Sequence, residues 1–298
     1  MKPLLPGLHH VTAITGHAQK NHDFYTDTLG LRMVKLTVNF DDPSSYHLYY
    51  GDGVGSPGTI MTFFASENSV PGRIGTGQAT VTTFAIPGGS LGYWRTRLEK
   101  AGFPVKQLEV WGKSRLEFQD PDGLRLAMTE EGVGETAIRG FAGVTLAQAN
   151  PAASHSLLND TLGFQLADAS AERKLYRSQT SWLELTSDQG AAGRMGAGTV
   201  HHIAWRTPDD AHQALWLQTL ENQGYRVSPV MDRNYFHSIY FREPGGVLFE
   251  IATDPPGFTV DQPLEELGKK LVLPAWLEPH REKIQRFLPS LKIPVKSK

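Results

Sequence analysis

The sequence contains no cysteine. Disulfide bonds and thiolate metal ligands are therefore excluded, so a metal site in this chain must be built from imidazole and oxygen ligands. The absence of cysteine also fits a reducing compartment, and we expect the protein to be cytoplasmic.

Excess charge and long apolar runs are also missing. The 29 basic and 31 acidic side chains leave a net charge of −2 without a basic stripe, which makes nucleic acid an unfavourable partner. No apolar run approaches the roughly 18 residues of a membrane span, so we expect no membrane association. The first residues also lack the pattern of a signal peptide. With 40% hydrophobic and 20% charged residues, the 298-residue chain resembles an ordinary globular enzyme of about two domains.

An internal repeat is the strongest feature that is present. Three segments return in the same order, DTLGL as DTLGF, LEKAGFPV as LENQGYRV and DPDGL as EPGGV, beginning at residues 27 and 160, 98 and 220, and 120 and 243. Ordered repetition at a nearly constant offset indicates a duplicated half. We therefore divide the chain into two halves and a C-terminal extension, residues 1–135, 136–255 and 256–298.

Each half divides again into two similar units. Four β-rich runs open the units, at residues 7–15, 78–87, 140–148 and 198–208. Each run is followed by a helical pattern that ends before a glycine, the expected helix stop, at Gly30, Gly102, Gly163 and Gly224. Short strand-like runs separated by Gly-Pro and Asp-Pro turns follow each helix. The pattern predicts an α+β fold of four β-α-β-β-β units. Leucines at partly helical spacing in the extension predict a helical tail packed on the body or on another subunit.

Two histidine doublets lie at matching places in the repeat, in LHHVT (residues 8–12) and VHHIA (residues 200–204). A glutamate, Glu250, lies inside the apolar run GVLFEI, although carboxylates are seldom buried unless they are paired or metal-bound. Two imidazoles and one carboxylate are what a mononuclear iron(II) centre needs if it must keep coordination positions open.

Alignment of the units selects which residues can form this centre. The first strands place His10 and His202 opposite Thr83 and Gly143, and the last strands align Glu250 with Thr62, Ala127 and Glu184. His10, His202 and Glu250 can meet at one metal site only if unit 1 pairs with unit 4. Units 2 and 3 would then form a module without metal, with Glu184 as an ion-pair or hydrogen-bond partner.

At this level of detail the sequence resembles the vicinal oxygen chelate superfamily, which contains glyoxalases, bleomycin-resistance proteins and extradiol dioxygenases. Within it, the chain is similar to the hydroquinone-type ring-cleaving dioxygenases. LHHVT, VHHIA and the segments 46–59 and 232–250 carry the resemblance, which extends over nearly the whole chain. It implies two modules with curved mixed sheets.

The resemblance also implies roles for individual residues. It assigns iron to His10, His202 and Glu250, and outer-sphere roles to His201, Tyr240, Arg233, His9 and Thr12. From its place at the start of a strand near the site, His237 is a further candidate for contact with substrate. One conflict is visible, because adjacent strand residues point to opposite faces. His9 and His201 can approach the site only if the strands bulge or curl.

The expected activity is ring cleavage of an aromatic diol, of hydroquinone or catechol type, by O₂. A three-ligand iron(II) site leaves positions for a diol oxygen and for O₂, and manganese(II) would accept the same ligands. His201 is the candidate base, and Arg233 or Tyr240 would stabilise a developing oxyanion. Thr62 stands where a glyoxalase-type site commonly has a second carboxylate, which favours O₂ activation. Two alternatives stay open, a metal-dependent isomerase or lyase and a non-catalytic sequestering protein. A homo-oligomer is compatible with the sequence.

Overall fold

The computed structural model describes residues 4–67 and 69–293, and within them the β-α-β-β-β pattern occurs four times. Unit 1 consists of β1 (Leu8–Thr15), α1 (Ala18–Asp23) with its π-helical continuation η1 (Phe24–Thr28), β2 (Arg32–Val38), β3 (Tyr46–Gly51) and β4 (Ile60–Ala65). Unit 2 consists of β5 (Gln78–Ile86), α2 (Leu91–Lys100), β6 (Lys106–Val110), β7 (Lys113–Gln119) and β8 (Arg125–Glu130).

The second half repeats this order. Unit 3 consists of β9 (Phe141–Gln148), α3 (Pro151–Ser156) with the π-helical η2 (Leu157–Thr161), β10 (Gln165–Ala169), β11 (Arg173–Arg177) and β12 (Trp182–Ser187). Unit 4 consists of β13 (Thr199–Thr207), α4 (Asp210–Asn222), β14 (Met231–Asp232), β15 (Phe236–Arg242) and β16 (Leu248–Pro256). The four glycines expected to stop the helices all adopt positive φ angles, between 75° and 87°, which glycine accepts without strain.

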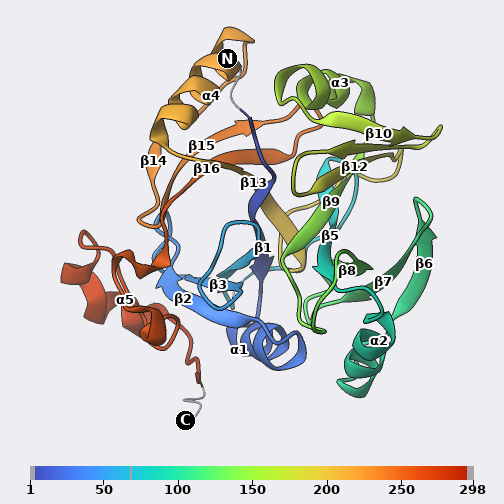
Figure 1. Ribbon diagram of the computed structural model, residues 1–298. Coiled ribbons are helices and arrows are strands. Elements are labelled where there is room, and N and C mark those ends of the chain that lie inside the picture. The colour runs from blue at the N-terminus through green and yellow to red at the C-terminus, as the bar shows by residue number, and fades with distance from the viewer. Residues whose placement is uncertain (1–3, 68, 294–298) are drawn as a thin grey trace.

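Within the described residues the strands form two eight-stranded mixed sheets, and each sheet takes one unit from each half. The orders are β14-β15-β16-β13-β1-β4-β3-β2 and β10-β11-β12-β9-β5-β8-β7-β6. Figure 1 shows the two curved sheets side by side. The prediction that unit 1 pairs with unit 4 is therefore confirmed. The chain boundaries after residues 135 and 255 stay predictions.

The two seams, where units from different halves meet, carry matching β-bulges. In the β1–β13 seam, the extra residues are His9, between Leu8 and His10, and His201, between Val200 and His202. In the β5–β9 seam the corresponding extra residues are Thr80 and Ala142. The bulges therefore place Val81 at the position of His10. Our alignment of Thr83 with His10 was wrong by two residues, because a sequence comparison does not show the bulges.

Side-chain alternation separates two layers in the first sheet. Ile203 and Trp205 on β13 point into the large core beneath the helices, whereas Ala204 belongs to a smaller cluster on the opposite, inner face. The helix α4 covers the outer layer with Trp216, which is fully buried. Burying each such side chain contributes about 1.5–3 kcal/mol. The inner face is therefore free to carry polar groups.

The C-terminal extension packs on the first sheet, as expected. Its described residues form three 3₁₀ turns and one short helix, η3 (Phe258–Val260), η4 (Leu264–Glu266), η5 (Glu278–His280) and α5 (Arg281–Phe287). Leu273 and Ile284 are buried against Val38 on β2, and Leu271 forms a bridge to Leu36. Between residues 256 and 293, the described part of the extension, α5 is the one α-helix, because prolines at 263, 274 and 279 interrupt the helical spacing.

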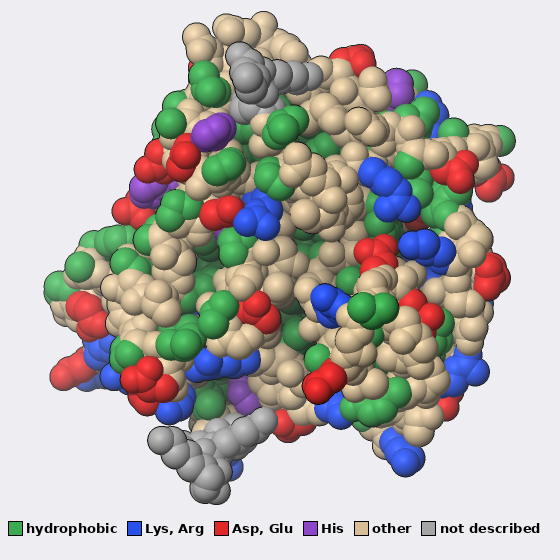
Figure 2. All heavy atoms as spheres, viewed as in Figure 1, with side chains coloured by type: hydrophobic (Ala, Val, Ile, Leu, Met, Phe, Trp, Pro, Cys, Tyr) green, Lys and Arg blue, Asp and Glu red, His purple; other side chains and the backbone are tan. Residues whose placement is uncertain are grey.

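Residues 4–67 and 69–293 include no helix with the length and apolar character needed to cross a membrane. On the face shown in Figure 2, basic and acidic side chains are interspersed.

Candidate metal centre

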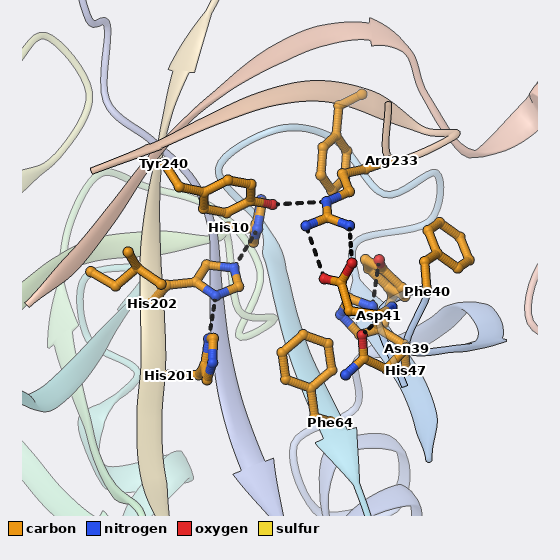
Figure 3. A pocket seen from close by; sticks show the side chains of 13 residues that line it. His10, Asn39, Phe40, Asp41, His47, Phe64, His201, His202, Arg233 and Tyr240 are labelled. Carbon is orange, nitrogen blue, oxygen red and sulfur yellow. Dashed lines mark hydrogen bonds and ion pairs between the residues drawn. The ribbon is translucent and has the colours of Figure 1, made fainter. Parts of the chain in front are cut away.

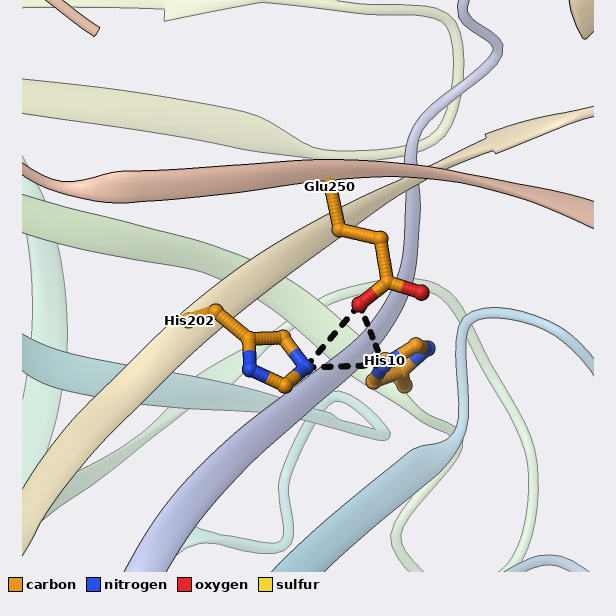
Figure 4. A group of neighbouring side chains, drawn as sticks. All are labelled: His10, His202 and Glu250. Carbon is orange, nitrogen blue, oxygen red and sulfur yellow. Dashed lines mark hydrogen bonds and ion pairs between the residues drawn. The ribbon is translucent and has the colours of Figure 1, made fainter. Parts of the chain in front are cut away.

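Three side chains from three strands converge on the inner face of the first sheet. The Nε2 atoms of His10 and His202 are 3.3 Å apart. The Oε2 atom of Glu250 lies 3.3 Å from the first nitrogen and 3.0 Å from the second. Figure 4 shows the three groups pointing toward one another. The expectation that His10 and His202 meet, although they lie 192 positions apart, is confirmed.

The strand register explains this convergence. In the antiparallel seam, His10 is opposite Ala204 and Thr12 is opposite His202, so the two imidazoles lie diagonally on one face. In the parallel pair β13–β16, Ala204 is opposite Glu250. Same-face diagonal neighbours on adjacent strands lie within reach of long side chains. The pairing of units 1 and 4 therefore brings His10, His202 and Glu250 together.

The donor set has the properties of a divalent metal site. Glu250 is fully buried, and its Oε1 accepts a hydrogen bond from Ser238. Among the described residues, the near neighbours of its Oε2 are the two imidazole nitrogens. Burial raises the pKa of Glu250, but His10 and His202 outweigh that effect and hold it well below its usual range. A buried carboxylate facing two imidazoles calls for a cation, and donors about 3 Å apart suit bonds of about 2.1 Å.

The bulged histidines hold the two candidate ligands by their outer ring nitrogens. The Nδ1 atoms of His9 and His10 are 2.9 Å apart, and those of His201 and His202 are 2.8 Å apart. A metal-binding imidazole commonly donates its other N–H to a neighbouring acceptor, which fixes the ring's tautomer. Each doublet thus supplies one candidate ligand and one residue that orients it. The bulges also resolve the conflict between adjacent inward-facing histidines.

A cavity of about 310 Å³ opens over the two candidate histidine ligands. Its walls are largely aromatic, and Figure 3 shows Phe40, Phe64 and Tyr240 around it. Three of the predicted outer-sphere residues, His201, Tyr240 and Arg233, line this cavity. Apolar walls with a few convergent polar groups are typical of a small-molecule site.

Arg233 organises the polar side of the cavity. Its Nε donates to the hydroxyl of Tyr240 at 3.1 Å, and its guanidinium carbon lies 5.3 Å from the centre of the Tyr240 ring. The outer nitrogens form a bidentate ion pair with Asp41, 3.0 Å and 3.2 Å from its two oxygens. Burial raises the pKa of the Tyr240 phenol, so the hydroxyl keeps its proton. That proton is available to a ligand in the cavity, since Arg233 uses the oxygen as an acceptor.

His201 lies beside this group, and its environment opposes protonation. Burial, reinforced by the neighbouring His202, lowers the pKa of His201 to about 3. The near-neutral pKa expected of a free histidine therefore does not apply to His201. With its Nδ1 engaged by His202, the other ring nitrogen is the one left for the cavity.

A further polar network lies at the cavity wall, and its hydrogen bonds were not predicted from the sequence. His47 lines the cavity, its Nε2 lies 2.7 Å from the hydroxyl of Thr62, and its Nδ1 lies 2.8 Å from the hydroxyl of Tyr49. Thr62 in turn contacts Thr12 at 3.0 Å. Alternation in the HLYY run could have placed His47 and Tyr49 on one face. The Thr62 hydroxyl is therefore held by two protein partners, Thr12 and His47.

Three predicted residues are not part of the cavity wall. Thr12 is fully buried and bonds to Thr62, and His9 is buried behind His10 against Phe236. His237 lies 2.6 Å from Asp210 on α4, at the outer face of the sheet. Its direct contact with substrate is thus not supported, because strand alternation puts residues 237 and 240 on opposite faces.

The chain belongs to the glyoxalase/bleomycin resistance protein/dioxygenase superfamily. The family model matches residues 7–128 and 140–251, one match in each half. The family resemblance predicted from the doublets and the repeated units is confirmed, as is the α+β fold of two modules.

Individual relatives narrow the comparison. The chain is 46% identical over 297 residues to "Putative ring-cleaving dioxygenase MhqO" of Bacillus subtilis (strain 168), covering 95% of each chain. It is 32% identical over 307 residues to the chlorohydroquinone/hydroquinone 1,2-dioxygenase of Sphingobium indicum, again covering 95% of each. A crystal structure from Bacillus subtilis has 45% identity, covers 99% of both chains and gives a TM-score of 0.95.

Proposed function

We propose that this protein is an iron(II)-dependent dioxygenase that opens the ring of an aromatic diol with O₂. The observation that carries the proposal is the set of two imidazoles and one carboxylate, of which the two imidazoles line an aromatic cavity. Such a set leaves neighbouring coordination positions for two small ligands. The dioxygenase names of the relatives support the same reaction class.

His10, His202 and Glu250 would hold the iron. When bound, iron(II) supplies adjacent positions for a diol oxygen and O₂, together with the electron transfer that zinc does not offer. Within the chain, the outer histidines of the doublets fix the ligand rings by contacts of 2.8 Å and 2.9 Å. Burial of the ligands excludes bulk water from their inner side.

The cavity would orient the substrate ring against the ligands. Phe64 and Phe236 provide apolar walls, while Tyr240 presents a hydroxyl whose proton is free to donate. A donor fixed in advance stabilises negative charge that develops on a substrate oxygen. We infer that Tyr240 and Arg233 act together on the diol, with His201 as a second polar contact. The hydroquinone named in one relative makes a 1,4-diol the first substrate to test.

The direct test is an O₂-uptake assay with protein loaded anaerobically with iron(II). Consumption of O₂ in step with the loss of a hydroquinone or catechol is the expected result. Zinc-loaded protein should be inactive, because zinc has no redox chemistry. Turnover of a non-aromatic substrate under argon would contradict the proposal and would indicate an isomerase or lyase, which needs only a Lewis acid. A manganese-loaded sample in the same assay compares the two redox-active metals.

We further propose a cytoplasmic location.

A further inference from the structure

A buried lysine ties the C-terminal extension to the first sheet. Lys35 on β2 is fully buried. Its ammonium group contacts three acceptors, all from the extension: the carbonyl of Phe258 at 3.1 Å, Asp261 Oδ1 at 2.5 Å and Gln262 Oε1 at 2.7 Å. These acceptors match the three donors of an ammonium group. A buried charge is costly without partners, so the segment 258–262 is held firmly against β2.

The second oxygen of Asp261 reaches a different element. It accepts a hydrogen bond from the Tyr235 hydroxyl at 3.0 Å and one from the Asn234 side-chain amide at 3.2 Å. These residues directly follow Arg233 in the turn between β14 and β15. Asn234 has a φ angle of 66°, a conformation in which asparagine is one of the tolerated residues. One carboxylate therefore joins the buried cation to the turn that presents Arg233.

Aromatic packing connects the same segment with the cavity wall. The Tyr235 ring centre lies 4.8 Å from the Lys35 ammonium and 5.0 Å from the Phe258 ring centre. Phe258 is in turn 5.2 Å from Tyr49, which lines the cavity and bonds to His47. In Figure 1 the extension, drawn in orange to red, lies beside β2. The extension thus contacts elements from both walls of the site.

We propose that Asp261 is a positioning residue, which holds the turn of residues 233–235 so that the Arg233 guanidinium stays on Tyr240 and Asp41. The extension is then a structural part of the active site. Its effect on turnover rests on the proposed function, whereas its effect on the turn does not. The ion pair with Asp41 alone cannot hold the Arg233 guanidinium in place. The Asp41 side chain is 65% exposed, so this ion pair is weak.

Hydrogen exchange of the apo protein tests the effect on the turn. The Arg233 and Tyr235 amides form hydrogen bonds inside the turn, to Phe236 and Arg233 carbonyls respectively. In Asp261→Asn we expect these two amides to exchange about tenfold faster, as in a local opening. Tyr235→Phe removes one bond to Asp261 and should give a smaller increase. Glu266→Gln removes an exposed ion pair with Lys269 in the same extension and serves as the matched control.

Two results would overturn the proposal at this stage. The first is unchanged exchange of both amides in Asp261→Asn. The second is an equal rise in exchange along the whole chain, which would show a loss of global stability alone. Should Asp261→Asn fail to fold, Tyr235→Phe decides the matter, because it keeps the aromatic ring and the buried Lys35–Asp261 pair.

A double-mutant cycle with Arg233→Ala tests the effect on the reaction. Alone, Asp261→Asn should lower kcat about tenfold at unchanged metal content, since small displacements of a positioning group have effects of this size or larger. In the Arg233→Ala background it should lower kcat less than about twofold further, because residues that act through one another are not additive. Equal losses in both backgrounds would overturn the proposal. Lack of any turnover by the wild type would instead contradict the proposed function, and the exchange data would still decide the role of Asp261.

Discussion

The two sheets hold a buried glutamate at the same place and neutralise it differently. Glu250 in the first sheet is opposite Ala204, two positions after His202 on β13. Glu184 in the second sheet is opposite Thr145, two positions after Gly143 on β9. Glu184 accepts hydrogen bonds from Trp111 at 2.9 Å and Thr145 at 2.9 Å. It also pairs with Arg173 at 3.1 Å and lies 3.8 Å from Arg115. The expectation that Glu184 is an ion-pair partner is confirmed.

The seam residues account for this difference. The second sheet has Val81 and Gly143 where the first has His10 and His202, and Thr80 and Ala142 where the first has the orienting histidines. A side chain at Gly143 would collide with Trp182, only 2.2 Å from the position of an added Cβ. The duplicated framework therefore buries a carboxylate in both copies. Arginines complete one site, and we propose that a metal ion completes the other.

The largest effect is expected from breaking the ligand set of the first sheet. His10→Ala or His202→Ala should each reduce turnover below detection, because iron would lose one of its three protein ligands. Circular dichroism should still show the fold, because both imidazoles face the cavity, where removal of a side chain leaves the strand pairing in place. Full activity in either variant would remove that residue from the proposed centre. The matched change Val81→Ala in the second sheet should leave turnover near the wild-type value.

The next effect concerns a residue that acts on substrate. Tyr240→Phe should lower kcat about 100-fold, as expected for removal of one fixed donor to a developing oxyanion. Iron affinity should stay unchanged, because the phenol contacts Arg233 and the cavity and is not one of the three converging groups. Steady-state kinetics and a metal titration of the same preparation measure the two quantities. A parallel loss of iron would show that Tyr240 acts on the centre itself.

A smaller effect is expected on stability in the second sheet. Glu184→Gln should reduce the free energy of unfolding by about 2 kcal/mol, below the roughly 3–5 kcal/mol of a fully buried pair, because Arg173 is half-exposed. Urea denaturation measures the change. Glu250→Gln in metal-free protein should be destabilising by less than this, since no arginine loses its partner there. The reverse order of the two values would contradict the account of how the charges are neutralised.

Hydrophobic periodicity and the internal repeat predicted three features of the structure. These are the four units, the pairing of units 1 and 4, and the convergence of His10, His202 and Glu250. Bulges at His9 and His201 could not be located, because they are a property of strand register. Contacts between residues far apart in the sequence, such as Asp41 with Arg233 and Lys35 with Asp261, have no repeated pattern in the sequence. His237 was considered for contact with substrate from its strand position alone, without the face of the strand.

The smallest effect concerns Asp120, in the turn that leads into β8 of the second sheet. Burial raises the pKa of Asp120 to about 7, above the 3.8 of a free carboxyl, although the Leu124 amide donates to it. The folded chain therefore binds this proton more tightly, so the contribution to stability is full below about pH 4 and is lost as the pH rises to 7. The Tm should fall over this range by about 2–4 °C more in the wild type than in Asp120→Asn. Parallel curves would contradict this assignment.

Metal stoichiometry tests the central claim most directly. Metal-free protein titrated anaerobically with iron(II) should bind one ion per chain in the wild type and in Glu184→Gln, and should lose tight binding in Glu250→Gln. This result would place the metal at the first sheet and leave the arginine-neutralised carboxylate of the second sheet without one. One ion retained in Glu250→Gln, or lost in Glu184→Gln, would contradict the account.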